Sequence, residues 1–246
     1  MAKVSAPKAA TRLVLSTLFS LGNAGAAKLA SRFFKTGKGQ YGEDDQFLGI
    51  RMPMLRSIAR DFRDAGVEVA LPLLKSGWHE ARAVALLLLV RLYRRGDEKT
   101  QKRIYEIYLK STRLINSWDL VDMSAEHIVG AWLEGKVAER RRVLGRLAKS
   151  ESRWERRIAV LATYHYIKKG EYDETFRVAQ LLLKDKEALI QKAVGWMLRE
   201  VGKRIGEKQE ESFLKQYYRQ MPRTMLRYAI ERFAELKRRQ YLSGSI

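Results

Sequence analysis

The chain lacks cysteine and has only three histidines, His79, His127 and His165, among its 246 residues. Without cysteine there is no disulfide, no thiolate nucleophile and no cysteine ligand for a zinc ion. Three scattered imidazoles are also too few for a His-rich metal site. The sequence therefore predicts a protein without a metal or other cofactor, and the lack of thiols fits a reducing compartment.

Long apolar runs are missing as well. The run 86–90 is short and lies between Arg82 and Arg91, whereas a membrane-spanning helix needs about 20 apolar residues. This run indicates a buried helix, and no membrane partner is expected.

Acidic residues are absent from the first 42 positions. The apolar stretch 13–21 follows several basic residues and precedes 24–26, Ala-Gly-Ala, an arrangement that resembles a secretory signal or transit peptide. Arg12 and Lys28 would equally bracket a helix with a basic face. We favour a retained helical segment within a single domain 1–246, in which residues 1–23 are a candidate for a loosely packed N-terminal segment.

Strand signals and prolines are scarce, whereas apolar spacing of i, i+3 and i+4 recurs along the chain. Pro53 stands where the first turn of a helix is expected. We predict an all-α protein. The predicted helices span residues 11–21, 24–35, 53–64, 67–75, 79–95, 97–110, 117–132, 136–149, 152–168, 172–183, 186–202, 207–219 and 222–239.

A repeat of about 40 residues runs through these helices. Trp118, Arg157 and Trp196 follow one another at intervals of 39 residues. Paired helices with this period are typical of HEAT-like repeats, which stack into an α-solenoid. We therefore expect a curved α-solenoid in which these three residues form a row on the concave side.

Charge is strongly unbalanced, with 48 Lys and Arg against 28 Asp and Glu, a formal net charge of +20. This favours a polyanionic partner, with nucleic acid as the first candidate. The alternative is a solvated basic surface without a ligand. An acidic membrane is disfavoured because the chain has no concentrated polybasic tail.

A glycine-rich segment at 37–50 carries the acidic run 43–45. Three neighbouring carboxylates could gather a divalent cation, but their spacing does not match a calcium-binding loop. We favour the simpler interpretation, in which these acids cap a helix or solvate a loop.

Trp118 and Asp122 are four residues apart and therefore share one face of the helix predicted at 117–132. The apolar stripe of that helix lies elsewhere, so Asp122 is a carboxylate held beside an indole on a basic protein. The alternative is an acid that interacts with the positive helix N-terminus, a role that suits Asp119 better.

Trp196 lies about 120° from the centre of the apolar stripe of the helix 186–202. Lys192 and Arg199 share its side of the helix. A binding groove and a second packing face both remain open explanations for this ring.

Arg157 flanks the core stripe of the helix 152–168, and Arg153 lies one turn earlier. The planar guanidinium fork is well suited to gripping phosphate. Trp154 and His165, on the stripe itself, are interpreted as core residues.

Four segments carry a family resemblance: IQKAVGWMLRE, SWDLVDMS, WERRIAV and FFKTGKGQYGEDDQFLGIRMPMLR. Together they resemble the AlkD-type DNA alkylpurine glycosylases, over roughly residues 28–235. The resemblance implies a superhelix of HEAT-like repeats with a concave, basic DNA-binding face, and hydrolytic excision of N3- and N7-alkylated purines without insertion of the lesion into a deep pocket.

By the same resemblance, the active-site residues are Trp118, Asp122 and Trp196, and a DNA-contacting arginine is Arg157. Phe33 stands where the family often has tyrosine, so the ring is kept and the hydroxyl is lost. The full set of DNA-binding candidates is Arg157, Arg153, Lys192, Arg199, Phe33 and Lys35.

The residue types suit that chemistry. An alkylated purine is already cationic and leaves as a neutral base, so a general acid adds little, and one carboxylate can suffice where glycoside hydrolysis usually employs two. Asp122 could stabilise an oxocarbenium-like sugar and position water. The faces of Trp118 and Trp196 could contribute roughly 0.5–2 kcal/mol each through cation–π contacts.

We therefore expect a monomeric glycosylase of duplex DNA containing alkylated purines, in the cytoplasm of a bacterial-type cell and at the nucleoid when it acts. The alternatives are a non-catalytic helical-repeat module that binds DNA or RNA, and a protein-interaction scaffold with tryptophan anchors. The salt dependence of binding distinguishes a DNA-binding protein from a protein-interaction scaffold, because binding to many phosphates weakens steeply as the salt concentration rises.

Overall fold

The computed structural model describes residues 6–246, and its regular elements are all helices. The described chain has one isolated β-bridge, between Gln46 and Trp78. The all-α class and the helical-repeat architecture are thereby confirmed. By internal contacts the chain divides into two compact units, one ending at Ser124 and the other spanning Ala125–Ile246.

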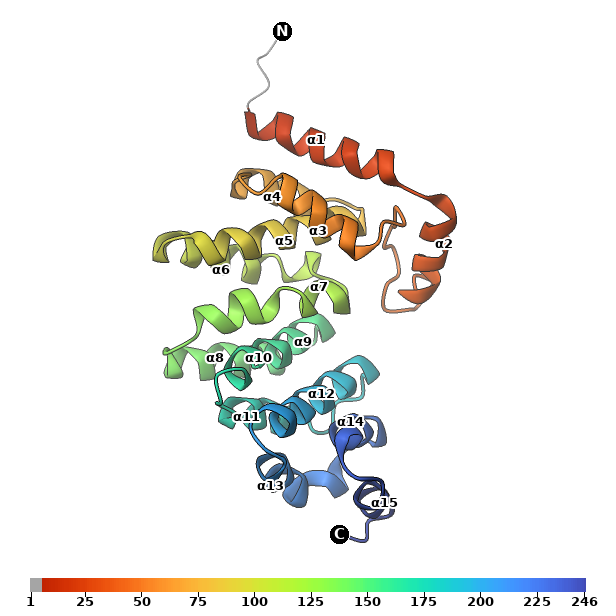
Figure 1. Cartoon of the computed structure of the whole chain (residues 1–246), viewed down its shortest axis with the longest axis vertical. Coiled ribbons are helices and arrows are strands. Elements are labelled where there is room, and N and C mark those ends of the chain that lie inside the picture. Colours follow the sequence, from red (N-terminus) through yellow and green to blue (C-terminus); the bar gives the residue numbers. More distant parts are fainter. Residues whose placement is uncertain (1–5) are drawn as a thin grey trace. The chain divides into compact units, whose positions relative to one another are not determined.

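The first unit is built around one long buried helix (Figure 1). Its elements are α1 (Ala6–Leu21), α2 (Ala24–Phe33), α3 (Met52–Asp61), α4 (Val67–Leu74), α5 (His79–Arg95), α6 (Glu98–Lys110), η1 (Thr112–Leu114) and α7 (Trp118–Asp122). Helix α5 packs against α1, α3, α4, α6 and α7. It can do so because the residues 83–86 are completely buried. In the run 86–90, from which a buried helix was predicted, every residue except the half-buried Leu87 is buried, so that prediction is confirmed.

The second unit stacks helix pairs along the chain (Figure 1). Its elements are η2 (Glu126–Gly130), α8 (Val137–Ala148), α9 (Arg153–Ala162), α10 (Tyr164–Ile167), α11 (Asp173–Leu181), α12 (Ala188–Arg204), α13 (Glu207–Tyr217), η3 (Tyr218–Gln220), α14 (Arg223–Ala229), η4 (Ile230–Arg232) and α15 (Glu235–Ser243). Helix α12 packs against α9, α11, α13 and α14.

Close packing of α12 on α14 requires a glycine. A Cβ atom at Gly195 would lie 2.4 Å from the carbonyl oxygen of Met225 and 2.6 Å from Cβ of Tyr228. The predicted apolar stripe of α12 is buried, with Ile190 and Val194 each 1 % exposed. Gly195 therefore brings the backbones of two neighbouring repeats together directly beside Trp196.

Three predicted helices are broken. The helix expected at 117–132 stops at Asp122 and resumes as the π-helix η2, and the helix expected at 152–168 is interrupted at Thr163. Ser124 Oγ donates to the Leu120 carbonyl at 2.6 Å, and Thr163 Oγ1 donates to the Val160 carbonyl at 2.7 Å. Such bonds from a side chain to the preceding turn compete with the regular helix ladder.

The third break falls within 222–239, where α14 gives way to η4 and then α15. Phe233 adopts an extended backbone, with φ −70° and ψ 153°, and its ring is 6 % exposed. Burial of this ring redirects the chain, so the continuous helix predicted there is wrong.

Helix α1 begins five residues before the predicted start, at Ala6. Val14 and Leu18 are completely buried, and the helix packs on α4 and α5. The predicted N-terminal segment 1–23 thus contains a packed helix, while residues 1–5, including Lys3, lie outside the described residues.

Within residues 6–246, no single helix is both long and apolar enough to cross a membrane. Taken together, α1 and α2 pass the same test of length and composition, but they are bent by 96° where they meet.

The row of three residues predicted from the 39-residue interval is divided between the units. Trp118 belongs to the first unit, whereas Arg157 and Trp196 belong to the second. The expected concave face that would unite them, and the single domain 1–246, stay predictions.

Candidate functional site

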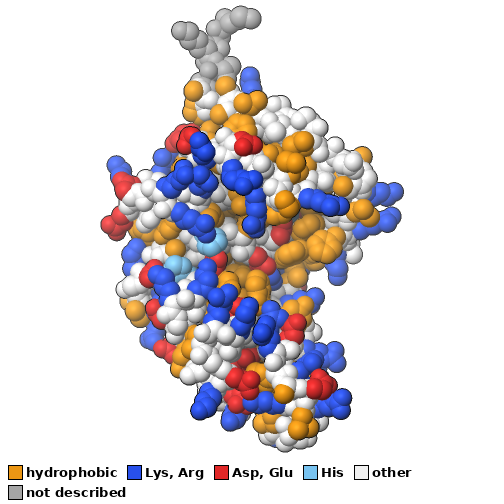
Figure 2. All heavy atoms as spheres, in the orientation of Figure 1, with side chains coloured by type: hydrophobic (Ala, Val, Ile, Leu, Met, Phe, Trp, Pro, Cys, Tyr) orange, Lys and Arg blue, Asp and Glu red, His pale blue; other side chains and the backbone are white. Residues whose placement is uncertain are grey.

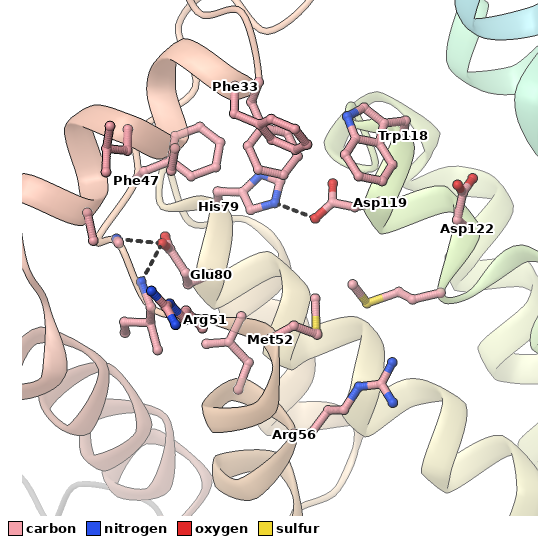
Figure 3. Close-up of a pocket in the computed structure, with 18 residues that line it drawn as sticks. Phe33, Phe47, Arg51, Met52, Arg56, His79, Glu80, Trp118, Asp119 and Asp122 are labelled. Atoms are coloured by element: carbon pink, nitrogen blue, oxygen red, sulfur yellow. Dashed lines mark hydrogen bonds and ion pairs between the residues drawn. The ribbon is translucent and has the colours of Figure 1, made fainter. Parts of the chain in front are cut away.

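A cavity of about 710 Å³ opens within the first unit (Figure 3). Its walls come from α2, the segment 47–51, α3, the first turn of α5, and α7. Trp118, Asp122 and Phe33 all line it. Three of the residues singled out from the sequence are therefore brought together by the fold, although Phe33 is 85 positions from Trp118 in the chain.

Aromatic rings form one side of the cavity. The ring of Phe34 stacks on the indole of Trp118, with centroids 5.4 Å apart and planes at 16°. The ring of Phe33 meets the same indole edge-on at 5.9 Å and is 65 % exposed. Phe34 stacks in turn on Phe47 at 4.9 Å. One face of Trp118 is thus covered by Phe34, and the half-buried indole lines the cavity.

His79 connects two carboxylates beneath these rings. Its Nδ1 lies 2.9 Å from Oδ2 of Asp45, and its Nε2 lies 2.9 Å from Oδ2 of Asp119. Arg82 pairs with the other oxygen of Asp45. The imidazole is 4 % exposed. This network joins the segment before α3, the start of α5 and the start of α7.

Burial alone would lower the pKa of His79, but the hydrogen bonds and negative charges of Asp119 and Asp45 outweigh it and raise the pKa to about 9. Burial would likewise raise the pKa of Asp45, yet the hydrogen bond and charge of His79 and the charge of Arg82 hold it below its usual value. At neutral pH the imidazole is therefore a cation that donates both N–H groups.

One sequence interpretation is extended here and another changes. Asp119 lies in the first turn of α7, as expected for an acid near a helix N-terminus, and it also accepts a hydrogen bond from His79. Asp45 was expected to cap a helix or solvate a loop, but it is 9 % exposed and ion-paired. In the sequence, His79 is 34 positions from Asp45 and 40 positions from Asp119. No local pattern could have indicated a network with these separations.

Glu80 fixes the turn that leads into the cavity. Its carboxylate accepts the backbone N–H groups of Leu48, Gly49 and Ile50, at 2.9, 2.8 and 3.2 Å. Gly49 has φ +81°, and a Cβ there would lie 2.4 Å from the backbone nitrogen of Ala27. A left-handed backbone in direct contact with α2 is accessible to glycine and strained for other residues.

The polar side chains that line the cavity differ in their hydrogen bonds and burial. Glu80 and Asp119 are committed to the turn and to His79, respectively. Asp122 projects from α7 four residues after Trp118 and is half-buried. Arg51 and Arg56 supply positive charge from the opposite side (Figure 3). The arrangement offers aromatic faces, a half-buried carboxylate and flanking guanidinium groups to a ligand.

Trp196 lies in the second unit, within a polar cluster. Its Nε1 donates to Oε1 of Glu200 at 3.3 Å, and its ring lies 6.2 Å from that of Tyr164. Tyr164 and Arg204 also donate to Glu200. Trp196 is half-buried. The second-packing-face explanation thus holds in part, because one edge of the indole is engaged within the unit.

The predicted DNA-binding residues are engaged to different degrees. Arg153 pairs with Glu187 at 3.3 Å, and Arg199 pairs with Glu231. Lys192 is exposed, with its ammonium 5.8 Å from the centre of the Tyr228 ring. Lys35 is exposed, with φ +53°.

Arg157 is 5 % exposed, and its Nη1 donates to the carbonyl of Leu189 at 2.6 Å, which ties α9 to the first turn of α12. We expect Arg157→Ala to lower the thermal unfolding midpoint by several degrees, because the half-buried carbonyl of Leu189 loses its donor and the packing around the buried Arg157 side chain is reduced. Calorimetry on both proteins measures this.

The phosphate contact predicted for Arg157 is tested on the same variant. Loss of such a contact lowers the salt slope of duplex binding by about one unit. If Arg157→Ala lowers the thermal unfolding midpoint but leaves the salt slope of duplex binding unchanged, Arg157 packs between α9 and α12 and does not contact phosphate.

Among residues 6–246, no three or more His, Asp or Glu side chains are grouped so that they could hold a metal ion. The predicted core residue Trp154 is buried, at 9 % exposure, and Trp132 is buried as well, at 8 %. His165 is half-buried, and its Nε2 lies 3.0 Å from Oε2 of Glu134.

Comparison with known proteins gives matches to a protein family and to solved structures. The family model described as "DNA alkylation repair enzyme" matches residues 14–233. A solved structure described as a predicted DNA alkylation repair enzyme from Enterococcus faecalis has a TM-score of 0.67 and 19 % identity. The alignment covers 87 % of this chain and 97 % of that chain. At this identity the structural likeness supports the fold alone. No curated protein matches.

Proposed function

The chain belongs to the DNA alkylation repair enzyme family, and on this basis we propose that it is a DNA glycosylase. It hydrolyses the N-glycosidic bond of cationic N3- and N7-alkylated purines in duplex DNA. The observation that carries the proposal is the shared cavity of Trp118, Asp122 and Phe33, in which an aromatic face and a carboxylate stand four residues apart on one short helix.

The reaction needs no proton for its leaving group. Alkylation at N3 or N7 places a positive charge on the purine. When the bond from the base to C1′ breaks, its electron pair neutralises that charge. The sugar becomes an oxocarbenium-like cation, to which water adds with loss of a proton. What a protein must supply is therefore negative charge near C1′ and an acceptor for that water.

Asp122 is assigned this double role. Its carboxylate stabilises the developing charge on the sugar and accepts a hydrogen bond from the attacking water. Asp122 shares both the cavity and the short helix α7 with Trp118, which supports this assignment. Asp119 and Glu80, the other acids of the cavity, hold His79 and the turn 48–50 in place.

The aromatic residues are proposed to stabilise the positive charge on the base and the sugar. Electron-rich ring faces attract a cationic base or sugar, and Trp118 has one face not stacked on Phe34. Trp196 is proposed to have the same role. Phe33, edge-on to Trp118 and largely exposed, is proposed to contact the DNA beside the lesion.

Incubation of the protein with a duplex that carries a single 7-methylguanine is expected to release the free base, which chromatography detects. A matched duplex with uracil should release nothing, because uracil is neutral and no general acid is assigned. Efficient uracil release would mean that an acid has been missed. Binding of both duplexes without any release would favour the non-catalytic DNA-binding alternative.

We further propose that the protein acts as a monomer, in the cytoplasm of a bacterial-type cell and at the nucleoid. Sedimentation of the protein with and without duplex DNA tests the first point, since a monomer predicts one protein chain per bound lesion duplex.

A further inference from the structure

A second cavity of about 580 Å³ lies between α3 and α5 of the first unit. It has an apolar floor and an arginine wall. The floor residues are Pro53, Ala59, Leu87 and Val90, and the arginines are Arg56, Arg60, Arg91, Arg94 and Arg95. Figure 2 shows Lys and Arg side chains gathered over the region of α3 and α5. We call this feature the arginine cleft.

Most of the positive charge of the arginine cleft has no acidic partner among the described residues. No Asp or Glu lines it. Within residues 6–246, Arg56, Arg60, Arg91 and Arg95 take part in no ion pair. The Nε of Arg91 is buried without a hydrogen-bond partner. Clustered cations beside apolar atoms repel one another unless an anion joins them.

The predicted DNA-binding arginines provide a contrast. Arg153 and Arg199 are paired with Glu187 and Glu231. In the arginine cleft, by comparison, four guanidinium groups are in no ion pair within residues 6–246, those of Arg56, Arg60, Arg91 and Arg95. Each planar fork matches the oxygens of a phosphate.

The spacing of the arginines suits a chain of phosphates. Arg56 and Arg60 are four residues apart on α3, and Arg91 and Arg95 are four apart on α5. Four residues of an α-helix advance about 6 Å, which is comparable to the separation of successive phosphates in a DNA strand. A single small anion would engage only part of this two-sided array.

Arg56 connects the arginine cleft to the candidate site, because it lines both cavities. In the site it stands across from Phe33 and Trp118 (Figure 3). A strand that places a nucleotide against Trp118 could therefore continue past Arg56 along α3 and α5.

We propose that the arginine cleft binds consecutive backbone phosphates of the DNA strand that enters the candidate site. This inference rests on the proposed function for the presence of a nucleotide at Trp118. The contacts carry no sequence information. They fix the strand so that the target sugar is aligned with the cavity.

The test measures binding of an undamaged fluorescent duplex over a range of salt concentrations. For Arg91→Ala/Arg95→Ala in the full chain, the salt slope is expected to fall by about one to two units, because each phosphate contact contributes about 0.9. The matched control is Lys102→Ala/Lys110→Ala. These exposed α6 lysines line neither cavity, and their removal changes the net charge equally, so the slope should change by much less.

Two further variants distinguish the hydrogen-bonding geometry of the guanidinium groups from their charge, and a loss of phosphate contacts from a loss of folding. Arg91→Lys/Arg95→Lys keeps the charge but removes the forks, so the slope should be retained while affinity at fixed salt falls severalfold. Arg60→Ala changes one exposed side chain of α3, and it should lower the slope by about one unit even if the α5 variants fail to fold.

If the salt slope of duplex binding is the same for Arg91→Ala/Arg95→Ala and for the lysine control, the arginine cleft is not a phosphate site. Because the duplex is undamaged, this result does not depend on base release. Normal 7-methylguanine release with an unchanged slope rejects the cleft and leaves the proposed function intact. A lowered slope in a protein that releases no base keeps the cleft and rejects the glycosylase.

Discussion

Replacing Asp122 with asparagine is expected to slow release of 7-methylguanine by about a hundredfold or more. That is the scale found when a single preorganised electrostatic group is lost from an active site. Asparagine keeps the shape and some hydrogen-bonding capacity of the side chain but removes the negative charge. The oxocarbenium-like sugar would then form in the cavity without its counter-charge.

Single-turnover kinetics with excess protein measure this effect without interference from product release. DNA affinity should hold or rise, because an acid near the phosphates has been removed. The fold should survive, since Asp122 is half-buried and ends α7. Trp118→Ala and Trp196→Ala should each lose less activity, as weaker cation–π contributors. A folded Asp122→Asn protein with full activity would falsify the mechanism.

His79→Gln is expected to lower the free energy of unfolding by about 3–5 kcal/mol, the usual cost of removing one partner from a buried ion pair. Glutamine cannot carry the charge that balances Asp45 and Asp119, and its amide cannot reproduce both N–H directions of the imidazolium. Arg82 still pairs with Asp45, so the uncompensated carboxylate is chiefly Asp119. Denaturant unfolding at pH 6 measures the change.

The pH dependence separates this network from a general packing defect. The folded pKa of His79 is about 9, above its ordinary value of 6.5. Its contribution to stability is therefore complete below about pH 6.5 and lost as pH rises through 9. Wild type should lose stability over this window, whereas His79→Gln should lose much less. Parallel curves for the two proteins would contradict the assignment of a charged imidazole.

Local periodicity accounts for most of what could be predicted. The buried stripe of α12 follows directly from apolar residues at helical spacing, and so does the shared face of Trp118 and Asp122. The family resemblance drawn from the short motifs is confirmed by the match over residues 14–233. These features are encoded within one or two helical turns, which is the range that spacing arguments reach.

The remaining features depend on contacts between distant segments. The sequence indicates Phe33 and not its neighbour Phe34, because only the fold decides which ring stacks on Trp118. The helix breaks after Asp122 and at Thr163 arise from hydroxyl groups that a periodic pattern treats as neutral. The arginine cleft had a visible sign, arginines four residues apart on two helices, but their convergence depends on how α3 packs against α5.

Helix α2 has no buried residue, although it carries Phe33 into the candidate site. Its position depends on the turn held by Glu80 and on the backbone bond from Asn23 N–H to the Leu48 carbonyl, at 2.8 Å. Substitutions along α2 therefore cost the core little, whereas those at Gly49 or Glu80 would displace the whole helix. One wall of the cavity is free to diversify during evolution while the other walls stay constrained by the core. Sequence change on this helix would therefore alter the shape of the cavity at little cost in stability.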